Sequence, residues 1–159
     1  MNSARVFAIV LGLFVAPFGS ALAQDAFIGS WVLDAANSKG PPGMVATSGK
    51  LDITAAGGGK YTSVSEATIG GTTGRSEITF SVDGKDYAVT TTPAQPGATI
   101  TQSIARESDT VYKSDLKVNG QLIATAVTEI SSDGKTLTQT TTGVGQFAAL
   151  SGATVFQRK

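Results

Sequence analysis

Hydrophobic and polar residues alternate with a period of two along most of the chain. In residues 75–82, for example, Ile78, Phe80 and Val82 occupy every second position, with polar residues between them. This periodicity, carried by β-branched and aromatic side chains, predicts a strand with one buried face. The same reasoning predicts about ten strands and no convincing helix. We expect strands at residues 27–34, 50–55, 60–69, 75–82, 86–92, 98–105, 110–118, 121–130, 135–142 and 152–158.

Short turns join most of these strands. Asn119-Gly120 is the strongest hairpin signal, and Asp83-Gly84 and Asp133-Gly134 also predict tight turns, because such residues tolerate positive φ. Antiparallel strands joined in this way form a meander, which removes its exposed edges by closing on itself. The sequence therefore predicts an all-β fold, an antiparallel up-and-down β-barrel. A two-sheet sandwich is the alternative, but no long crossover follows residue 49.

The one long connection comes early, at residues 36–49. It contains Pro41-Pro42 between glycines, and consecutive prolines continue neither a helix nor a central strand. We expect a loop that is long enough to cross one end of the barrel.

The first 23 residues have a different character. Arg5 precedes an apolar run from Val6 to Phe18, and Ala21-Leu22-Ala23 ends the segment. This arrangement is typical of a secretory signal peptide, and the run is too short to span a hydrocarbon core of about 30 Å. A buried N-terminal helix is the alternative, but the segment shows no amphipathic pattern. We expect a signal peptide at residues 1–23, cleaved after Ala23, and one domain at residues 24–159 in the periplasm or outside the cell.

Histidine and cysteine are both absent from the 159 residues. Their absence excludes histidine-bound zinc or haem, thiolate metal sites, thiol nucleophiles and nucleophile–histidine pairs. It also excludes disulfides, so the fold depends on burial and hydrogen bonding. Residues 24–159 carry eleven basic and twelve acidic residues, which gives no basic field to attract nucleic acid. We expect no metal, no cofactor, no nucleic-acid partner and no membrane span after cleavage.

Titratable side chains do not gather into a catalytic constellation. Glu66, Glu77 and Glu129 alternate with apolar residues within strands, and we expect them on the solvated face. Arg75 and Arg106 each lie beside a turn, where exposure is expected. We therefore predict that the protein is not an enzyme.

Large apolar and aromatic side chains on the inward strand faces are the candidate ligand-binding residues. They either fill a packed core or line a cavity for one small ligand. Each assignment depends on the register, because a slip of one residue moves a side chain to the opposite face. The set comprises Tyr61, Ile78, Phe80, Tyr87, Ile100, Tyr112, Leu122 and Phe156.

The segment Phe27-x-Gly29-x-Trp31-x-Leu33 resembles the first-strand signature of the calycins, which include the lipocalins and the fatty-acid-binding proteins. Residues 29–39 resemble more closely the start of small exported bacterial lipocalin-like proteins of unknown function. The resemblance implies that Gly29 and Trp31 lie at the closed end of the barrel, with an arginine of the last strand against the tryptophan. The candidate is Arg158; a solvated C-terminal side chain is the alternative.

The last strand departs from the fatty-acid-binding proteins, in which an Arg-x-Tyr segment binds the ligand carboxylate. Thr154 and Phe156 occupy the matching positions, so we expect neither that carboxylate clamp nor the helical lid of the family. The predicted function is an exported lipocalin-like protein that binds a small hydrophobic or amphipathic ligand in its barrel. The alternative is a secreted structural or interaction protein with a packed interior and no ligand. Any protein partner is unknown.

Overall fold

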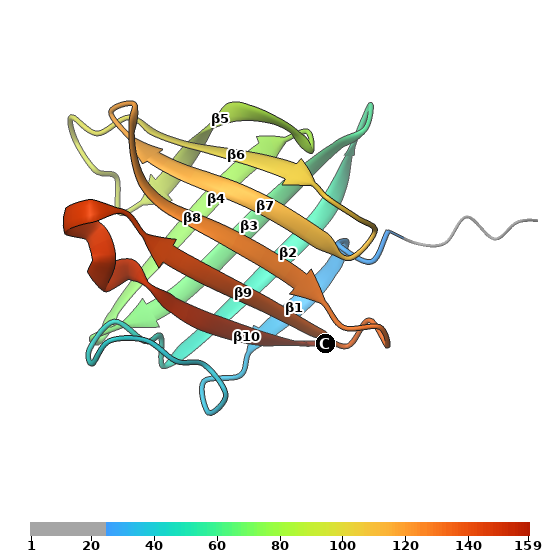
Figure 1. The fold of residues 1–159 in the computed structure, drawn as a ribbon, viewed down its shortest axis with the longest axis horizontal. Helices are drawn as coiled ribbons and strands as arrows, with labels where there is room; N and C mark the ends of the chain where they lie inside the picture. Colours follow the sequence, from blue (N-terminus) through green and yellow to red (C-terminus); the bar gives the residue numbers. More distant parts are fainter. Residues whose placement is uncertain (1–24) are drawn as a thin grey trace, which may run out of the picture.

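Ten antiparallel strands form a closed barrel over residues 25–159, the part of the chain that the computed structural model describes (Figure 1). A short 3-10 helix, η1 (Gly145–Leu150), joins the last two strands. The signal-peptide prediction concerns residues outside this range. The strands are β1 (Gly29–Leu33), β2 (Ser48–Gly57), β3 (Lys60–Ile69), β4 (Thr72–Phe80), β5 (Asp83–Thr92), β6 (Ile100–Arg106), β7 (Val111–Val118), β8 (Gln121–Ile130), β9 (Thr136–Gly143) and β10 (Gly152–Arg158).

The first strand closes the barrel because it pairs with both β2 and β10. Trp31 lies opposite Leu51 on one side and opposite Arg158 on the other. Each of β2 to β9 pairs with the strands that precede and follow it in sequence, and β10 pairs with β9 and β1. The predicted up-and-down barrel is confirmed, and the sandwich alternative is wrong.

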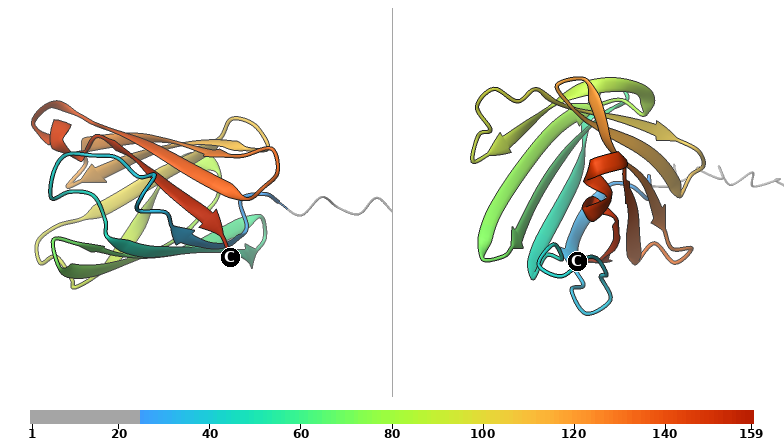
Figure 2. Two further views of the ribbon diagram at one scale, coloured as in Figure 1. Left: turned by 90° about the horizontal axis from the view of Figure 1, so that it is seen from below. Right: turned by 60° about the vertical axis from the view of Figure 1, so that its left-hand side comes forward.

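The connections fall alternately at two ends of the barrel. The closed end holds Asp25, the C-terminus and the β2–β3, β4–β5, β6–β7 and β8–β9 connections. The open end holds the loop at residues 34–47, η1 and the Asn119-Gly120 hairpin, whose paired φ values of 52° and 78° match the predicted turn. The right-hand view of Figure 2 looks toward the open end, where η1 lies in front of the strands.

One bulge reverses the face expected for Leu122. β7 and β8 pair regularly as far as Leu116 opposite Ala124, but the next pair joins Lys117 to Leu122. The extra residue, Ile123, has no opposite partner, points inward and is 8% exposed. Leu122 therefore shares the outer face with Lys117. The inward position predicted for Leu122 is wrong, because a bulge shifts the two-residue alternation by one.

The tight hairpin predicted at Asp83-Gly84 is also not formed. The pair of β4 and β5 nearest this connection is Ile78 with Val89, so the two strands are unpaired over the intervening residues. The start of β5 pairs with β6 instead, with Asp83 opposite Ala105 and a bulge between Asp83 and Asp86. Gly84 takes φ +75° within this bulge, a conformation that glycine adopts readily.

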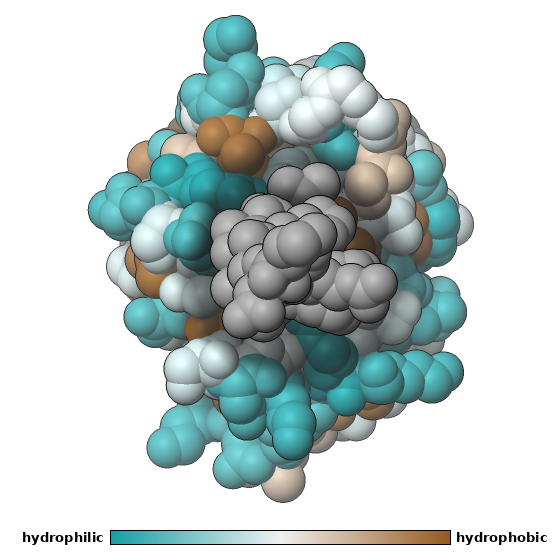
Figure 3. Space-filling view, turned by 90° about the vertical axis from the view of Figure 1, so that its right-hand side faces the viewer, coloured by the Kyte–Doolittle hydropathy of each residue, from teal (hydrophilic) through white to brown (hydrophobic). Residues whose placement is uncertain are grey.

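The hydrophobic core occupies the closed end rather than the whole barrel. The largest fully buried side chains are Trp31, Tyr112, Phe80, Ile53 and Leu137, and all of them project inward from the half of the barrel near the closed end. Figure 3 views this end from outside, and the part of its surface that the view shows in colour is mainly hydrophilic, with a few scattered hydrophobic residues. The core therefore forms the floor of the barrel at its closed end. The half of the barrel near the open end, called the upper half below, contains none of these fully buried side chains.

Candidate functional site

At the closed end of the barrel, the Arg158 side chain links two segments of the chain through three hydrogen bonds, one to the β8–β9 connection and two to the segment before β1. Its Nε donates a hydrogen bond to the Gly134 carbonyl at 2.6 Å, Nη1 to that of Ile28 at 2.8 Å and Nη2 to that of Ala26 at 2.7 Å. Its Cζ lies 4.1 Å from the centre of the Trp31 ring, within the range of a cation–π interaction. The arginine–tryptophan contact implied by the calycin signature is confirmed, and the solvated alternative for Arg158 is wrong.

Because Gly29 has no side chain, it leaves room for the Arg158 guanidinium. A Cβ at position 29 would overlap Nη1 of Arg158 and would lie 3.1 Å from its Cζ. Because alternate residues of a strand share a face, positions 29 and 31 both point inward. The first leaves room for the guanidinium and the second provides the ring, which explains the Gly-x-Trp spacing in physical terms.

A second group of polar side chains, the Asp25 cluster, consists of Asp25, Tyr61, Arg106 and Tyr112. Nη2 of Arg106 and the hydroxyl of Tyr61 both donate to Oδ2 of Asp25, and Nη2 also donates to the Tyr61 hydroxyl at 2.7 Å. The hydroxyl of Tyr112 donates to Oδ1 of Asp25 at 3.1 Å, and the amide of Phe27 donates to the same atom at 3.0 Å. The cluster ties the segment before β1 to β3, β6 and β7.

The environment of the cluster keeps each group in its ordinary charge state. Burial raises the pKa of Asp25, but the hydrogen bonds from Tyr61, the Phe27 amide and Arg106 outweigh burial, so the pKa lies below its usual value. Burial, followed by the Asp25 charge, raises the pKa of Tyr112. A general base or acid requires a pKa near the working pH. The Asp25 cluster is therefore a structural ion pair rather than a proton-transfer site.

Four aromatic rings form the floor of the interior, and two of them, Tyr61 and Tyr112, also carry the hydroxyls of the Asp25 cluster. Phe27 stacks on Tyr112 with ring centres 4.0 Å apart and contacts Tyr61 and Phe80 edge-on at 5.8 and 6.3 Å. Tyr61 stacks on Phe80 at 5.7 Å. Such pairs contribute about 0.5–1.5 kcal/mol each beyond the burial of their area, so this floor is firmly held.

Above the floor, the barrel encloses a cavity of about 450 Å³. A second cavity of about 380 Å³ lies toward β5–β8 and shares Gln102, Leu116 and Gln139 with the first, so the two meet. Small side chains such as Ser63 and Ala67 occupy inward positions here and leave the space unfilled. Pockets for small molecules range from about 300 to 1,000 Å³, so the combined space suits one such molecule.

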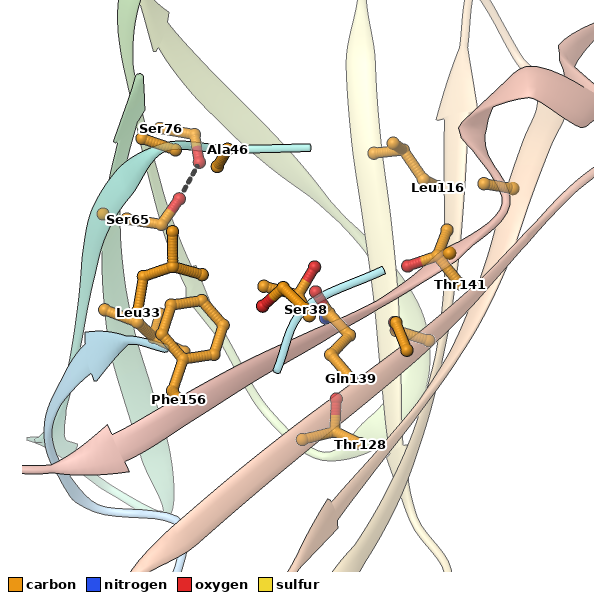
Figure 4. Close-up of a pocket in the computed structure, with 18 of the residues that line it drawn as sticks. Leu33, Ser38, Ala46, Ser65, Ser76, Leu116, Thr128, Gln139, Thr141 and Phe156 are labelled. Atoms are coloured by element: carbon orange, nitrogen blue, oxygen red, sulfur yellow. Dashed lines mark hydrogen bonds between the residues drawn. The ribbon is translucent and has the colours of Figure 1, made fainter. Parts of the chain in front are cut away.

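The lining of the cavity changes from apolar to polar with distance from the floor. Leu137 and Phe156 face each other across β9 and β10. The next inward positions on β8, β9 and β10 form a polar row of Thr128, Gln139 and Thr154. Figure 4 shows Thr128, Gln139 and Thr141 on one side of the cavity and the hydrogen-bonded pair Ser65 and Ser76, 2.8 Å apart, on the other.

The mouth of the cavity is bordered by the loop at residues 34–47 and by η1. Met44, Val45 and Leu150 belong to its lining, so the rim is apolar again. The hydroxyl of Ser38 anchors the loop, because it donates to the Asp34 carbonyl at 2.8 Å and accepts from the Val155 amide at 3.0 Å. The loop predicted across one end of the barrel is confirmed, with no helix between β1 and β2.

The eight candidate ligand-binding residues divide into three groups. Ile78, Phe80, Tyr112 and Phe156 line the larger cavity, and Ile100 lines the second. Tyr61 and Tyr87 pack against the core at the closed end and belong to the lining of neither cavity. Leu122 lies on the outer face. The structure thus brings together five of the eight around the interior space.

Sequence reasoning missed the polar part of the lining and the role of Asp25. Part of the signal for the polar lining was present, because Ser63 and Ser114 lie two residues after the recognised Tyr61 and Tyr112 and share their inward faces. Asp25 precedes the first strand, and no local pattern connects it to Arg106, which is 81 residues away.

Residues 25–159 hold no group of three or more Asp, Glu, His or Cys side chains suited to a metal ion. Within the same range, no helix combines the length and the apolar character that crossing a membrane requires.

Comparison with known proteins gives matches at the level of structure. No protein-family model and no curated protein sequence matches the chain. The fatty-acid-binding protein 1 of Echinococcus granulosus superimposes with a TM-score of 0.58 at 20% identity, covering 85% of this chain and 98% of that one. A mutant of the fluorescent protein UnaG superimposes with a TM-score of 0.55 at 18% identity, covering 84% and 96%.

The chain has the calycin fold. At these identities the likeness concerns the fold alone. The calycin fold implied by the opening strand is confirmed, while the narrower resemblance to exported bacterial proteins stays a prediction.

Proposed function

We propose that the protein is exported and binds one small hydrophobic or amphipathic molecule inside its barrel. The observation that carries the binding proposal is the cavity of about 450 Å³ above an aromatic floor. Export is supported by the composition of residues 1–23, from Arg5 to Ala23. The periplasm and the external medium both agree with that composition.

The size of the cavity argues against an interior that is simply loosely packed. Protein cores contain few voids larger than a water molecule, and the closed end of this barrel obeys that rule, with Trp31 and Phe80 fully buried. The same chain leaves a space many times larger directly above. The alternative of a packed interior without ligand therefore accounts for the closed end but not for the open half.

Binding suits the interior better than catalysis. In residues 25–159, the titratable groups at the floor are engaged with one another, because Arg106 is paired with Asp25 and Arg158 donates to three carbonyls, while Lys39, Lys50 and Glu66 border the cavity only at its mouth. One structural neighbour is named as a fatty-acid-binding protein, which agrees with binding as the use of this fold.

The test is uptake of an uncharged environment-sensitive dye, N-phenylnaphthylamine, by the folded protein. The proposal predicts saturable fluorescence enhancement with one dye per chain. Ala124→Phe should abolish it, because Ala124 is buried and lines both cavities. Val127→Phe is the matched control on the same strand, since Val127 lies opposite Lys113 and Thr140 on the outer face.

Thermal unfolding of both variants verifies that they fold. No saturable uptake by the unmodified protein, or equal uptake by Ala124→Phe, would contradict the proposal and favour the structural alternative.

A further inference from the structure

We infer that the ligand is uncharged at neutral pH and carries a hydrogen-bonding group, such as a hydroxyl or carboxamide, between apolar ends. The inference rests on the proposed ligand-binding function and names the class of molecule that the cavity selects. It follows from the distribution of charge and of hydrogen-bonding side chains along the cavity wall.

Below its mouth, the wall offers no partner for a buried charge. In residues 25–159, the two cations that face inward are Arg106 and Arg158, and both are already engaged at the floor. The charged residues at the mouth of the cavity, Lys39, Lys50 and Glu66, belong to its lining, but Lys39 and Lys50 are exposed to solvent and Lys50 lies 3.7 Å from Glu66. An ionised group that enters the cavity would lose its hydration without an opposite charge, which costs several kcal/mol.

Neutral polar side chains, by contrast, are plentiful at mid-depth. Gln102 and Gln139 belong to the lining of both cavities. The other neutral polar side chains of the larger cavity that make no hydrogen bond to another residue of the described range 25–159 are Ser63, Ser114, Thr128, Thr141 and Thr154. Two carboxamides and several hydroxyls therefore face the cavity with their donors and acceptors available to a ligand.

Their position in the barrel gives the order of groups along the ligand. The polar row Thr128–Gln139–Thr154 lies between the apolar floor, represented by Leu137 and Phe156, and the apolar rim, which includes Met44. A molecule that fills the cavity therefore meets apolar surface at both ends and amide or hydroxyl groups between them. Because a carboxamide both donates and accepts, the row suits hydroxyl and amide groups alike.

A probe series with one chain length separates the possibilities. Lauramide, lauryl alcohol, laurate and dodecane are each titrated at pH 7 to displace bound N-phenylnaphthylamine from the full-length folded protein. We expect lauramide and lauryl alcohol to bind at least about tenfold more tightly than laurate, because only laurate must bury a charge. Gln139→Leu should weaken lauramide about fivefold, the effect of losing one net hydrogen bond, and should leave dodecane unchanged.

Gln157→Leu is the matched control. Gln157 belongs to β10, but its side chain bonds to Thr136 and Asp34 on the outside of the barrel, so all four affinities should stay the same. Gln102→Leu, tested in the same way, keeps the comparison valid if Gln139→Leu fails to fold.

The outcomes distinguish the inference from the function on which it rests. Binding of laurate at least as tight as that of lauramide overturns the inference and leaves ligand binding intact. Equal affinities of lauramide and dodecane, unchanged in both Gln variants, overturn the role of the polar row. Failure of the dye and of all four probes to bind overturns the proposed function itself.

Discussion

Arg158 is the residue whose removal tests the account of the closed end most sharply. Arg158→Met keeps most of the apolar stem but removes three hydrogen bonds, of 2.6–2.8 Å, and the contact with the Trp31 ring. Hydrogen bonds from a charged donor contribute about 1.5–3 kcal/mol each, and a desolvated cation–π contact about 2 kcal/mol. Summed, these contributions reach about 6.5 kcal/mol or more. Because all three hydrogen bonds are only partly buried, water replaces part of them in the variant, and we expect a net loss of about 3–4 kcal/mol in unfolding free energy.

The assay is urea unfolding, followed by Trp31 fluorescence and by far-ultraviolet circular dichroism. Arg75→Met is the control, because the Arg75 guanidinium bonds to Glu77 at 2.7 Å and both side chains are more than 40% exposed. Surface pairs of this kind contribute under about 1 kcal/mol. A loss below about 1 kcal/mol for Arg158→Met would refute the reasoning.

A double-mutant cycle with Gly29→Ala checks the geometry independently. Gly29→Ala should destabilise the unmodified protein because the new Cβ overlaps the Arg158 guanidinium. The same substitution should cost at least about 1 kcal/mol less in the Arg158→Met background, where the overlapping atoms are absent. If the two substitutions changed the unfolding free energy additively, the absence of a side chain at Gly29 would not be what accommodates the guanidinium.

Two further substitutions test the rest of the closed end. Trp31→Ala should cost about 3–5 kcal/mol, as the truncation of a fully buried aromatic. Trp31→Phe should cost distinctly less, because the indole Nε1 makes no hydrogen bond within residues 25–159; both are measured by circular dichroism in urea. Asp25→Asn should lower the unfolding free energy by about 2 kcal/mol at pH 7, where the ionised carboxylate accepts bonds from Arg106 and Tyr112. Because the folded-state pKa of Asp25 lies below its ordinary value, its contribution is complete above the unfolded-state pKa of about 3.9 and disappears as the pH falls through the folded-state pKa. The difference between Asp25→Asn and the unmodified protein should therefore shrink below about pH 4. Asp86→Asn, which breaks an outer pair with Lys117, should show under about 1 kcal/mol.

The strand order and most inward faces could be predicted from sequence because they depend on local information. Two-residue alternation and turns such as Asn119-Gly120 specify strands and hairpins within a few residues of each other. One of the two exceptions, the face of Leu122, is local too. The alternation of Leu122, Ala124 and Ala126 with their neighbours predicts an inward Leu122. The bulge that turns Leu122 outward cannot be recognised from this alternation, because the pattern of residues continues through it unchanged.

The site was harder to predict because it depends on long-range contacts and on small residues. Asp25 meets Tyr61, Arg106 and Tyr112 only after the barrel closes. A search for ligand-binding residues that favours large apolar side chains also finds the floor of a cavity more readily than its walls. Tyr61 illustrates this, since it belongs to the aromatic floor but not to the cavity lining, whereas Ser63, two residues later on the same face, lines the space itself.

The central claim, that the upper half of the barrel holds a small molecule, is tested most directly by native mass spectrometry of protein purified gently from its natural source. The account predicts a folded species heavier than the bare chain by the mass of one small molecule, which is released as an uncharged compound on denaturation. Ala124→Phe expressed in the same source should lack this species, and Val127→Phe should retain it. A folded protein with the mass of the bare chain alone, together with no uptake of N-phenylnaphthylamine, would contradict the claim.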